Sequence, residues 1–127
     1  MIKVSSLRVI PDNMPKITKE NMAKLKKIIA EDKMFMKIKP IPVDMSKDNL
    51  VLKGRLRVKA IQLLGMTEIP ESWVYDASNL TDDEKKELIK IDQTAYWDSV
   101  AHKWDIYWDD WVENLRKKAF GEKNDKK

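Results

Sequence analysis

The sequence contains no cysteine, a single histidine and no long apolar run. Without cysteine the chain can form neither disulfides nor thiolate metal sites, and it has no thiol nucleophile. His102, the lone histidine, has no recognisable triad partners near it, so general-base catalysis of that type is not indicated. No apolar segment reaches the length of a membrane span or of a signal-peptide core. We therefore expect a cytoplasmic protein that makes no membrane contact.

Charged residues are abundant, and they are distributed unevenly. The chain has 25 basic and 21 acidic residues, and its net charge is +4. Basic residues crowd positions 16 to 59, whereas acidic residues concentrate between positions 76 and 113. Such asymmetry suits a face that meets phosphates. A chain of 127 residues is long enough for one compact domain. We expect that domain over residues 1–120, with a sheet-containing part at about 1–80, a helical part at 81–120 and a charged flexible tail at 121–127.

Hydrophobic spacing and turn residues predict an α+β fold, with a small sheet early in the chain and helices late. Thr18 is expected to cap a first helix that has one apolar face. Thr81 and Glu84 form a capping box, so a second helix is expected to run from there toward Asp92. The predicted strands cover residues 2–10, 40–43, 49–53 and 69–76, and the prolines of the second suggest an edge strand.

From Trp97 onward the tryptophans recur at helical spacing. Trp97, Trp104, Trp108 and Trp111 follow one another at intervals of seven, four and three residues, which places them on one helical face. Core packing is the favoured interpretation of this stripe. Aromatic side chains could also stack on the bases of single-stranded nucleic acid, although the neighbouring charges are acidic. A third interpretation is a surface for a protein partner or a second copy, formed by Trp104, Trp108 and Trp111.

The most informative stretch is Gly54-Arg-Leu-Arg57 together with the apolar run before it. Residues 49–53 predict a buried strand, and Gly54 then lets the backbone turn into a helix that ends at Gly65. A helix start offers unpaired N–H groups and the positive end of a dipole, so it favours an anion such as phosphate. The alternative is a solvated amphipathic helix that merely begins with arginines. The candidate phosphate- or nucleotide-binding residues are Gly54, Arg55, Leu56, Arg57, Lys59, Asn13, Lys16 and Gln93.

These segments resemble the ParB/sulfiredoxin-like superfamily, and most closely the small ParB N-terminal-like (ParB-like nuclease) domains of phages and mobile elements. The family signature glycine–x–x–arginine–x–x–alanine is similar to Gly54-Arg-Leu-Arg57-Val-Lys-Ala60, and Leu64-Gly65 and Ile69-Pro70 follow it as in the family. Its Asp-Asn and Trp-Asp pairs resemble Asp92-Gln93 and Trp97-Asp98, with glutamine replacing the usual asparagine. Its Asn-Pro-Arg turn is approximated by Asn13-Met-Pro15-Lys16. The resemblance covers about residues 5–110.

The resemblance implies a ParB/sulfiredoxin-like fold and a role in phage or mobile-element DNA metabolism. The expected ligand is a nucleotide such as CTP, together with Mg²⁺, or the phosphate of DNA. A metal-dependent DNA nuclease is the first alternative, with Asp92 and Asp98 as its candidate catalytic residues, and a non-catalytic adaptor is the second. Arg55 stands where sulfiredoxin has its cysteine, which rules out that chemistry. Partitioning proteins also need a downstream helix-turn-helix domain, for which 127 residues leave no room, so we expect a standalone domain.

Overall fold

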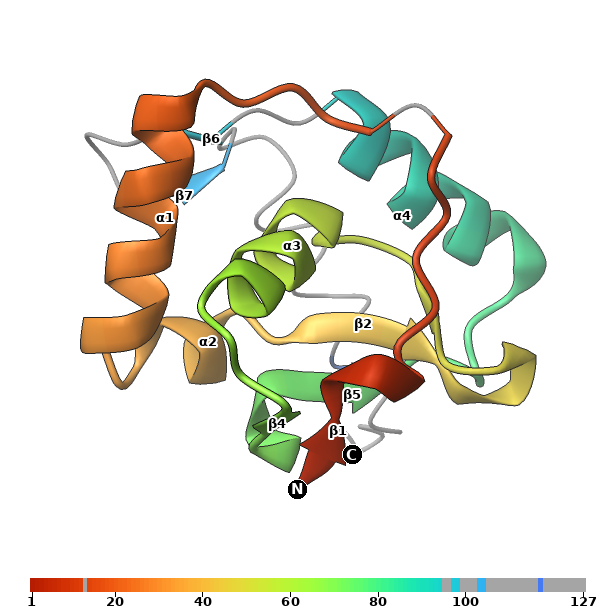
Figure 1. The fold of residues 1–127 in the computed structure, drawn as a ribbon. Helices are drawn as coiled ribbons and strands as arrows, with labels where there is room; N and C mark the ends of the chain where they lie inside the picture. Colours follow the sequence, from red (N-terminus) through yellow and green to blue (C-terminus); the bar gives the residue numbers. More distant parts are fainter. Residues whose placement is uncertain (13, 95–96, 99–102, 105–116, 118–127) are drawn as a thin grey trace.

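The computed structural model describes residues 1–12, 14–94, 97–98, 103–104 and 117. This part of the chain combines α-helices with short strands, as an α+β fold requires (Figure 1). Its helices are α1 (Lys19–Glu31), α2 (Phe35–Ile38), α3 (Arg55–Leu63) and α4 (Asp82–Thr94). Its strands are β1 (Ile2–Lys3), β2 (Ile41–Asp44), β3 (Leu50–Val51), β4 (Glu68–Ile69), β5 (Val74–Asp76), β6 (Trp97–Asp98) and β7 (Lys103–Trp104). Single 3-10 turns cover Val4–Ser6, Met45–Lys47 and Glu71–Trp73.

The central sheet has the strand order β3-β2-β5, and β1 pairs separately with β4. Strand β2 is antiparallel to β3 and parallel to β5. The prediction that residues 40–43 form an edge strand is therefore wrong, because β2 lies in the centre. Pro42 accepts a hydrogen bond from Leu52 N–H at 3.0 Å, but it has no N–H of its own to donate. The β2–β3 pairing ends next to it, at Val43 and Val51, so the missing donor interrupts no ladder bond to β3.

Two predicted strands are shorter in the structure than the hydrophobic pattern indicated. The strand expected at residues 2–10 ends after Lys3, where a 3-10 turn begins. The strand expected at 69–76 divides into β4 and β5 because Pro70 begins a second 3-10 turn between them. Apolar residues thus reach the core from 3-10 turns as well as from strands. The alternation of apolar and polar residues does not distinguish a strand from a 3-10 turn.

Both predicted helix starts are confirmed. Thr18 accepts a hydrogen bond from Asn21 N–H at 3.1 Å and so caps α1. Thr81 N–H donates to Glu84 Oε1 at 2.9 Å, and Glu84 N–H donates to Thr81 Oγ1 at 3.2 Å. This reciprocal pair is the capping box, and it starts the helix whose last turn carries Asp92.

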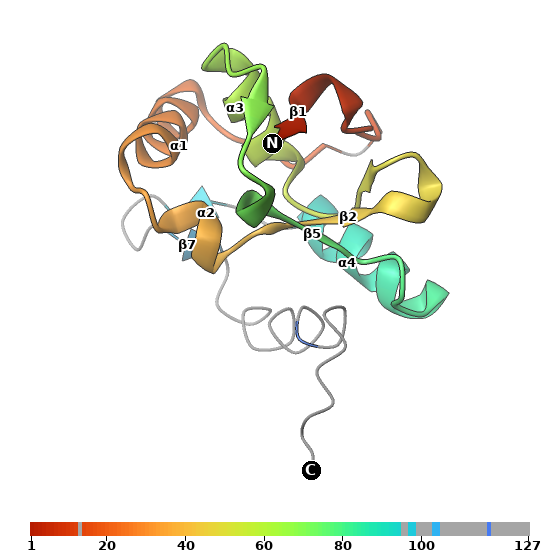
Figure 2. The ribbon, with the colours of Figure 1, turned by 90° about the horizontal axis from the view of Figure 1, so that it is seen from below.

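Helix α3 occupies the middle of the structure, over the central sheet and between α1 and α4 (Figure 1; Figure 2 gives the view from below). It packs most extensively on α1. The main core joins Leu25 and Ile29 of α1, Leu56 and Ile61 of α3, and Val43 of β2, all of them buried. In the part of the chain that the structure describes, no helix is both long and apolar enough to cross a bilayer.

The continuous helix expected from Trp97 is not observed where the structure describes this region. Strands β6 and β7 are antiparallel, with Trp97 opposite Trp104 and Asp98 opposite Lys103. The helical spacing of the two tryptophans was therefore misleading, because they meet across a two-stranded ladder rather than along one helix face. Trp108 and Trp111, and with them the predicted partner surface, lie outside the described residues.

Candidate anion site at the start of α3

Gly54 begins the candidate site, and its backbone requires glycine. It is the residue before α3 and has φ +89°, in the left-handed region that side chains with a Cβ rarely adopt. A Cβ at this position would lie 2.7 Å from Arg57 Nη2 and 3.1 Å from Arg57 Nε. The guanidinium of Arg57 therefore folds back over Gly54, in space that only glycine leaves open.

The start of α3 already holds an anion, which is the carboxylate of Asp92. Gly54 N–H donates a hydrogen bond to Asp92 Oδ1 at 2.8 Å, and Arg55 Nε donates to Asp92 Oδ2. Arg55 and Asp92 are each only 3 % exposed. The amide and guanidinium that the sequence assigned to phosphate thus bind a carboxylate from the last turn of α4.

Arg55 also ties the N-terminal segment to α3. Its Nη1 donates to the carbonyl oxygens of Ile10 at 2.8 Å and Asp12 at 2.6 Å. Three distant parts of the chain, residues 10–12, the start of α3 and the end of α4, therefore converge on one guanidinium.

Arg57 lies deeper still and is 1 % exposed. Its Nη1 donates to the carbonyl oxygen of Lys39 and contacts Met36 Sδ at 4.0 Å. Within the described residues it has no carboxylate within ion-pair distance, and its Nε has no hydrogen-bond acceptor. Burial lowers the pKa of Arg57 to about 10, although the charges of Asp92 and Tyr75 act to raise it. Additional negative charge near Arg57 would offset part of this desolvation cost.

Of the other predicted site residues, those that the structure describes lie away from the Gly54 turn. The side chain of Leu56 is part of the hydrophobic core. Lys16 and Lys59 are exposed, and Lys59 faces a groove between α1 and α3 rather than the Gly54 turn. Asn13 and the side chains of Gln93 and Asp98 lie outside the described part of the structure.

The role of Asp92 was not recognisable from local sequence. The sequence predicted Asp92 near the end of a helix and, for the nuclease alternative, as a candidate catalytic residue, yet its hydrogen-bond partners lie 37 and 38 residues earlier in the chain. No spacing rule connects positions so far apart. Among the described residues, no three His, Cys, Asp or Glu side chains converge as a potential metal site. The nuclease and adaptor functions remain predictions.

A second buried carboxylate, Asp44, joins β2 to α4. It is 1 % exposed and lies 3.0 Å from Lys85 Nζ through its Oδ2. Its Oδ1 accepts hydrogen bonds from Ser46 N–H at 3.1 Å and from Ser46 Oγ at 2.6 Å. Burial alone would raise the pKa of Asp44, but the hydrogen bonds of Ser46 and the charge of Lys85 outweigh it, so the pKa is lowered.

This lowered pKa predicts a specific acid sensitivity. As the pH falls below the ordinary aspartate value of 3.8, the unfolded chain binds the proton before the native protein does. The stabilisation by Asp44 is therefore present above pH 3.8 and is lost as the pH falls through the folded pKa. Urea unfolding between pH 7 and pH 2 should show a flatter decline in the free energy of unfolding for Asp44→Asn than for the wild type. Asp48→Asn, at an exposed position, should decline as the wild type does, and equal slopes for all three proteins would contradict the prediction.

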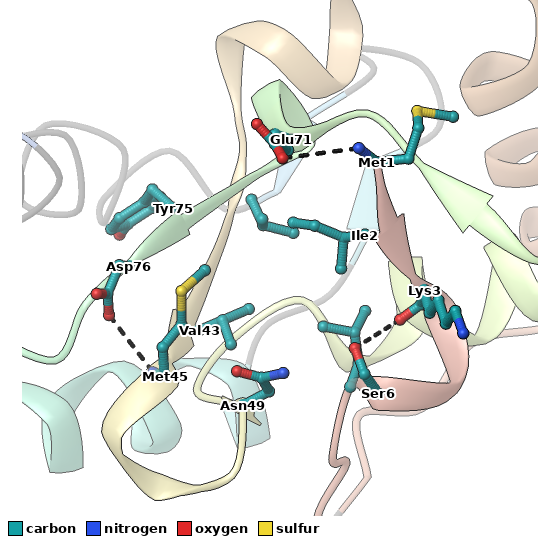
Figure 3. Close-up of a pocket in the computed structure, with 12 residues that line it drawn as sticks. Met1, Ile2, Lys3, Ser6, Val43, Met45, Asn49, Glu71, Tyr75 and Asp76 are labelled. Carbon is teal, nitrogen blue, oxygen red and sulfur yellow. Dashed lines mark hydrogen bonds and ion pairs between the residues drawn. The ribbon is translucent and has the colours of Figure 1, made fainter.

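A largely apolar cavity lies apart from this site. It has a volume of about 580 Å³ and opens between β1 and the edge of the central sheet. Figure 3 shows Ile2, Val43 and Met45 around it, with Asn49 at one side and Tyr75 at another. None of the predicted phosphate-binding residues that the structure describes lines it.

We compared the chain with known proteins in three ways. A scan against protein-family models, a search of curated proteins and a search of solved structures each found no match to this chain.

Proposed function

We propose that this chain is a ParB-like domain that binds the phosphate of a nucleotide, with CTP as the first ligand to test, or of nucleic acid at the start of α3. In this proposal Asp92 is a resident anion that the incoming phosphate replaces. The observation that supports it is the contact of the Asp92 carboxylate with Gly54 N–H and the Arg55 guanidinium. Backbone amides at a helix start and a guanidinium are the donors that phosphate oxygens also use.

The charge balance of the site favours an anion with more than one negative charge. Arg55 and Arg57 are both buried, and Asp92 is the carboxylate paired with Arg55 in the described structure. Among the described residues, Arg57 therefore carries a desolvated charge that the Asp92 carboxylate only partly compensates. A phosphate group, which carries up to two charges, would offset the charge of Arg57 more completely.

Exchange requires the last turn of α4 to withdraw, because Arg55 and Arg57 are inaccessible while Asp92 is in place. Withdrawal without a replacement would take the Asp92 carboxylate away from the buried Arg55, which is costly. Apparent affinity falls in proportion to the fraction of molecules in the open state. We therefore expect weak binding by the wild type and tighter binding when the charge of Asp92 is removed.

Calorimetric titration of the four ribonucleoside triphosphates with Mg²⁺ tests the proposal. Asp92→Asn keeps an oxygen that can accept from Gly54 N–H but loses the charge, and it should bind CTP at least about tenfold more tightly than the wild type. Arg57→Ala should lose binding. Asp44→Asn is the matched control, because it removes an equally buried carboxylate away from α3 and should give no gain in affinity.

The proposal would be refuted by the absence of heat with every triphosphate for both wild type and Asp92→Asn at roughly 50 µM protein. Circular dichroism should confirm that each variant is folded. If Asp92→Asn does not fold, the wild type and Arg57→Ala still decide, because CTP should raise the melting temperature of the former alone.

A further inference from the structure

A cationic groove lies on the outer face of the molecule between α1 and α3. Its volume is about 360 Å³. Lys19 and Lys26 of α1 and Lys59 of α3 line it, and none of the acidic residues that the structure describes does. None of these three lysines is in an ion pair with another described residue. Within the described part of the chain, the charge of the groove is therefore positive.

The segment that carries most of the groove is more basic than the chain as a whole. Residues 16–39 contain eight lysines and three acidic residues, so their net charge is +5, against +4 for all 127 residues. The groove lies on this segment and on the adjoining face of α3. A partner that carries a row of negative charges would be complementary to this groove.

Part of the lining of the groove is apolar. Ile17, Met22 and Leu63 contribute to it, and Leu63 is 55 % exposed. A double helix hides the faces of its bases and would leave these apolar side chains uncovered. A single strand exposes base faces beside its phosphates, so it can use both the apolar side chains and the lysines.

The spacing of the lysines fits a strand that runs along α1. Lys19 and Lys26 are seven residues apart, two helical turns, so they lie on one side of α1 about 10 Å apart along its axis. A stacked strand rises roughly 3.4 Å for each phosphate, so about three steps cover this distance. Lys59 lines the same groove from α3.

We propose that the α1–α3 groove binds single-stranded nucleic acid, with Lys19, Lys26 and Lys59 on its phosphates and the apolar side chains of Ile17, Met22 and Leu63 against a base. This site is distinct from the start of α3, where Arg55 and Arg57 are buried. It does not require Asp92 to move. The two proposals can therefore fail independently.

Fluorescence anisotropy with a labelled 15-nucleotide oligo(dT) tests this proposal on the full chain. Binding is expected with a dissociation constant of roughly 1–100 µM at low salt, and three phosphate contacts predict a slope of about −2 for log K against log salt. Lys26→Glu/Lys59→Glu should weaken binding by about tenfold or more. Lys24→Glu/Lys27→Glu is the matched control, because it makes the same change in net charge on exposed α1 positions that do not line the groove. The control should weaken binding no more than about threefold.

Four results would overturn the proposal. The first is that the wild type does not bind oligo(dT), and the second is that the two double variants lose equal affinity. The third is that the oligo(dT)·oligo(dA) duplex binds as tightly as the single strand or more tightly. The fourth is that polyglutamate displaces the labelled strand as effectively as unlabelled oligo(dT) does. The last result would assign the groove to an acidic protein partner. The groove variants should leave CTP titrations unchanged, which separates this test from that of the α3 start.

Discussion

Replacement of Asp92 by alanine is expected to lower the free energy of unfolding by about 3–5 kcal/mol. The substitution removes the acceptor of Gly54 N–H and the charge partner of Arg55, and both groups are buried. The loss of the carboxylate from the buried Arg55 guanidinium is the main cost, because water cannot replace the carboxylate without opening the structure. Urea denaturation of the wild type and the variant at pH 7 measures the effect.

Two comparison variants separate this effect from a general loss of α4. Glu87→Ala removes an exposed acidic side chain from the same helix and should change stability by no more than about 0.5 kcal/mol. Arg55→Met combined with Asp92→Ala removes both charges and should recover part of the loss. If the double variant is as unstable as the sum of its single variants, the pair is not coupled as the geometry indicates.

Replacement of Gly54 by alanine is expected to cost about 2–5 kcal/mol. The left-handed backbone at φ +89° contributes about 1–2 kcal/mol for a residue with a Cβ. The new methyl group would lie 2.7 Å from Arg57 Nη2, so the guanidinium must move away from the carbonyl of Lys39. A buried donor that loses its acceptor adds roughly 1–3 kcal/mol.

Gly65 provides a matched control for this prediction. It also has a positive φ, +77°, but a Cβ there would meet nothing within 4 Å. Gly65→Ala should therefore show only the backbone cost of about 1–2 kcal/mol. In an Arg57→Ala background Gly54→Ala should cost a similar amount, because the clash is gone. An unchanged cost in that background would show that Arg57 does not pack on Gly54 as described.

The elements that local chemistry specifies were predictable. The capping residues Thr18 and Thr81 begin helices where the sequence indicated, and Gly54 and Gly65 bracket α3 with positive φ angles. Each of these features depends on hydrogen bonds or torsions within about four residues, so the sequence carries the whole signal. Strand lengths were less predictable, since Pro42 and Pro70 affect pairing only in relation to a neighbouring strand.

The pairing of Trp97 with Trp104 illustrates the same limit. An interval of seven residues satisfies a helical repeat, and it also allows two residues to face each other across a hairpin. Spacing alone does not choose between them. The choice depends on the long-range contacts available to the segment.

The amino-acid order alone indicated a glycine turn followed by two arginines, Arg55 and Arg57, at one helix start, and this start is an environment that favours an anion. It did so because amide direction, helix dipole and side-chain charge are local properties. Folding decided which anion occupies that place, since Asp92 is brought there from the end of α4. Folding also buried Arg55 and Arg57 while leaving Lys59 at the surface, a division that depends on which neighbours pack against each face of α3.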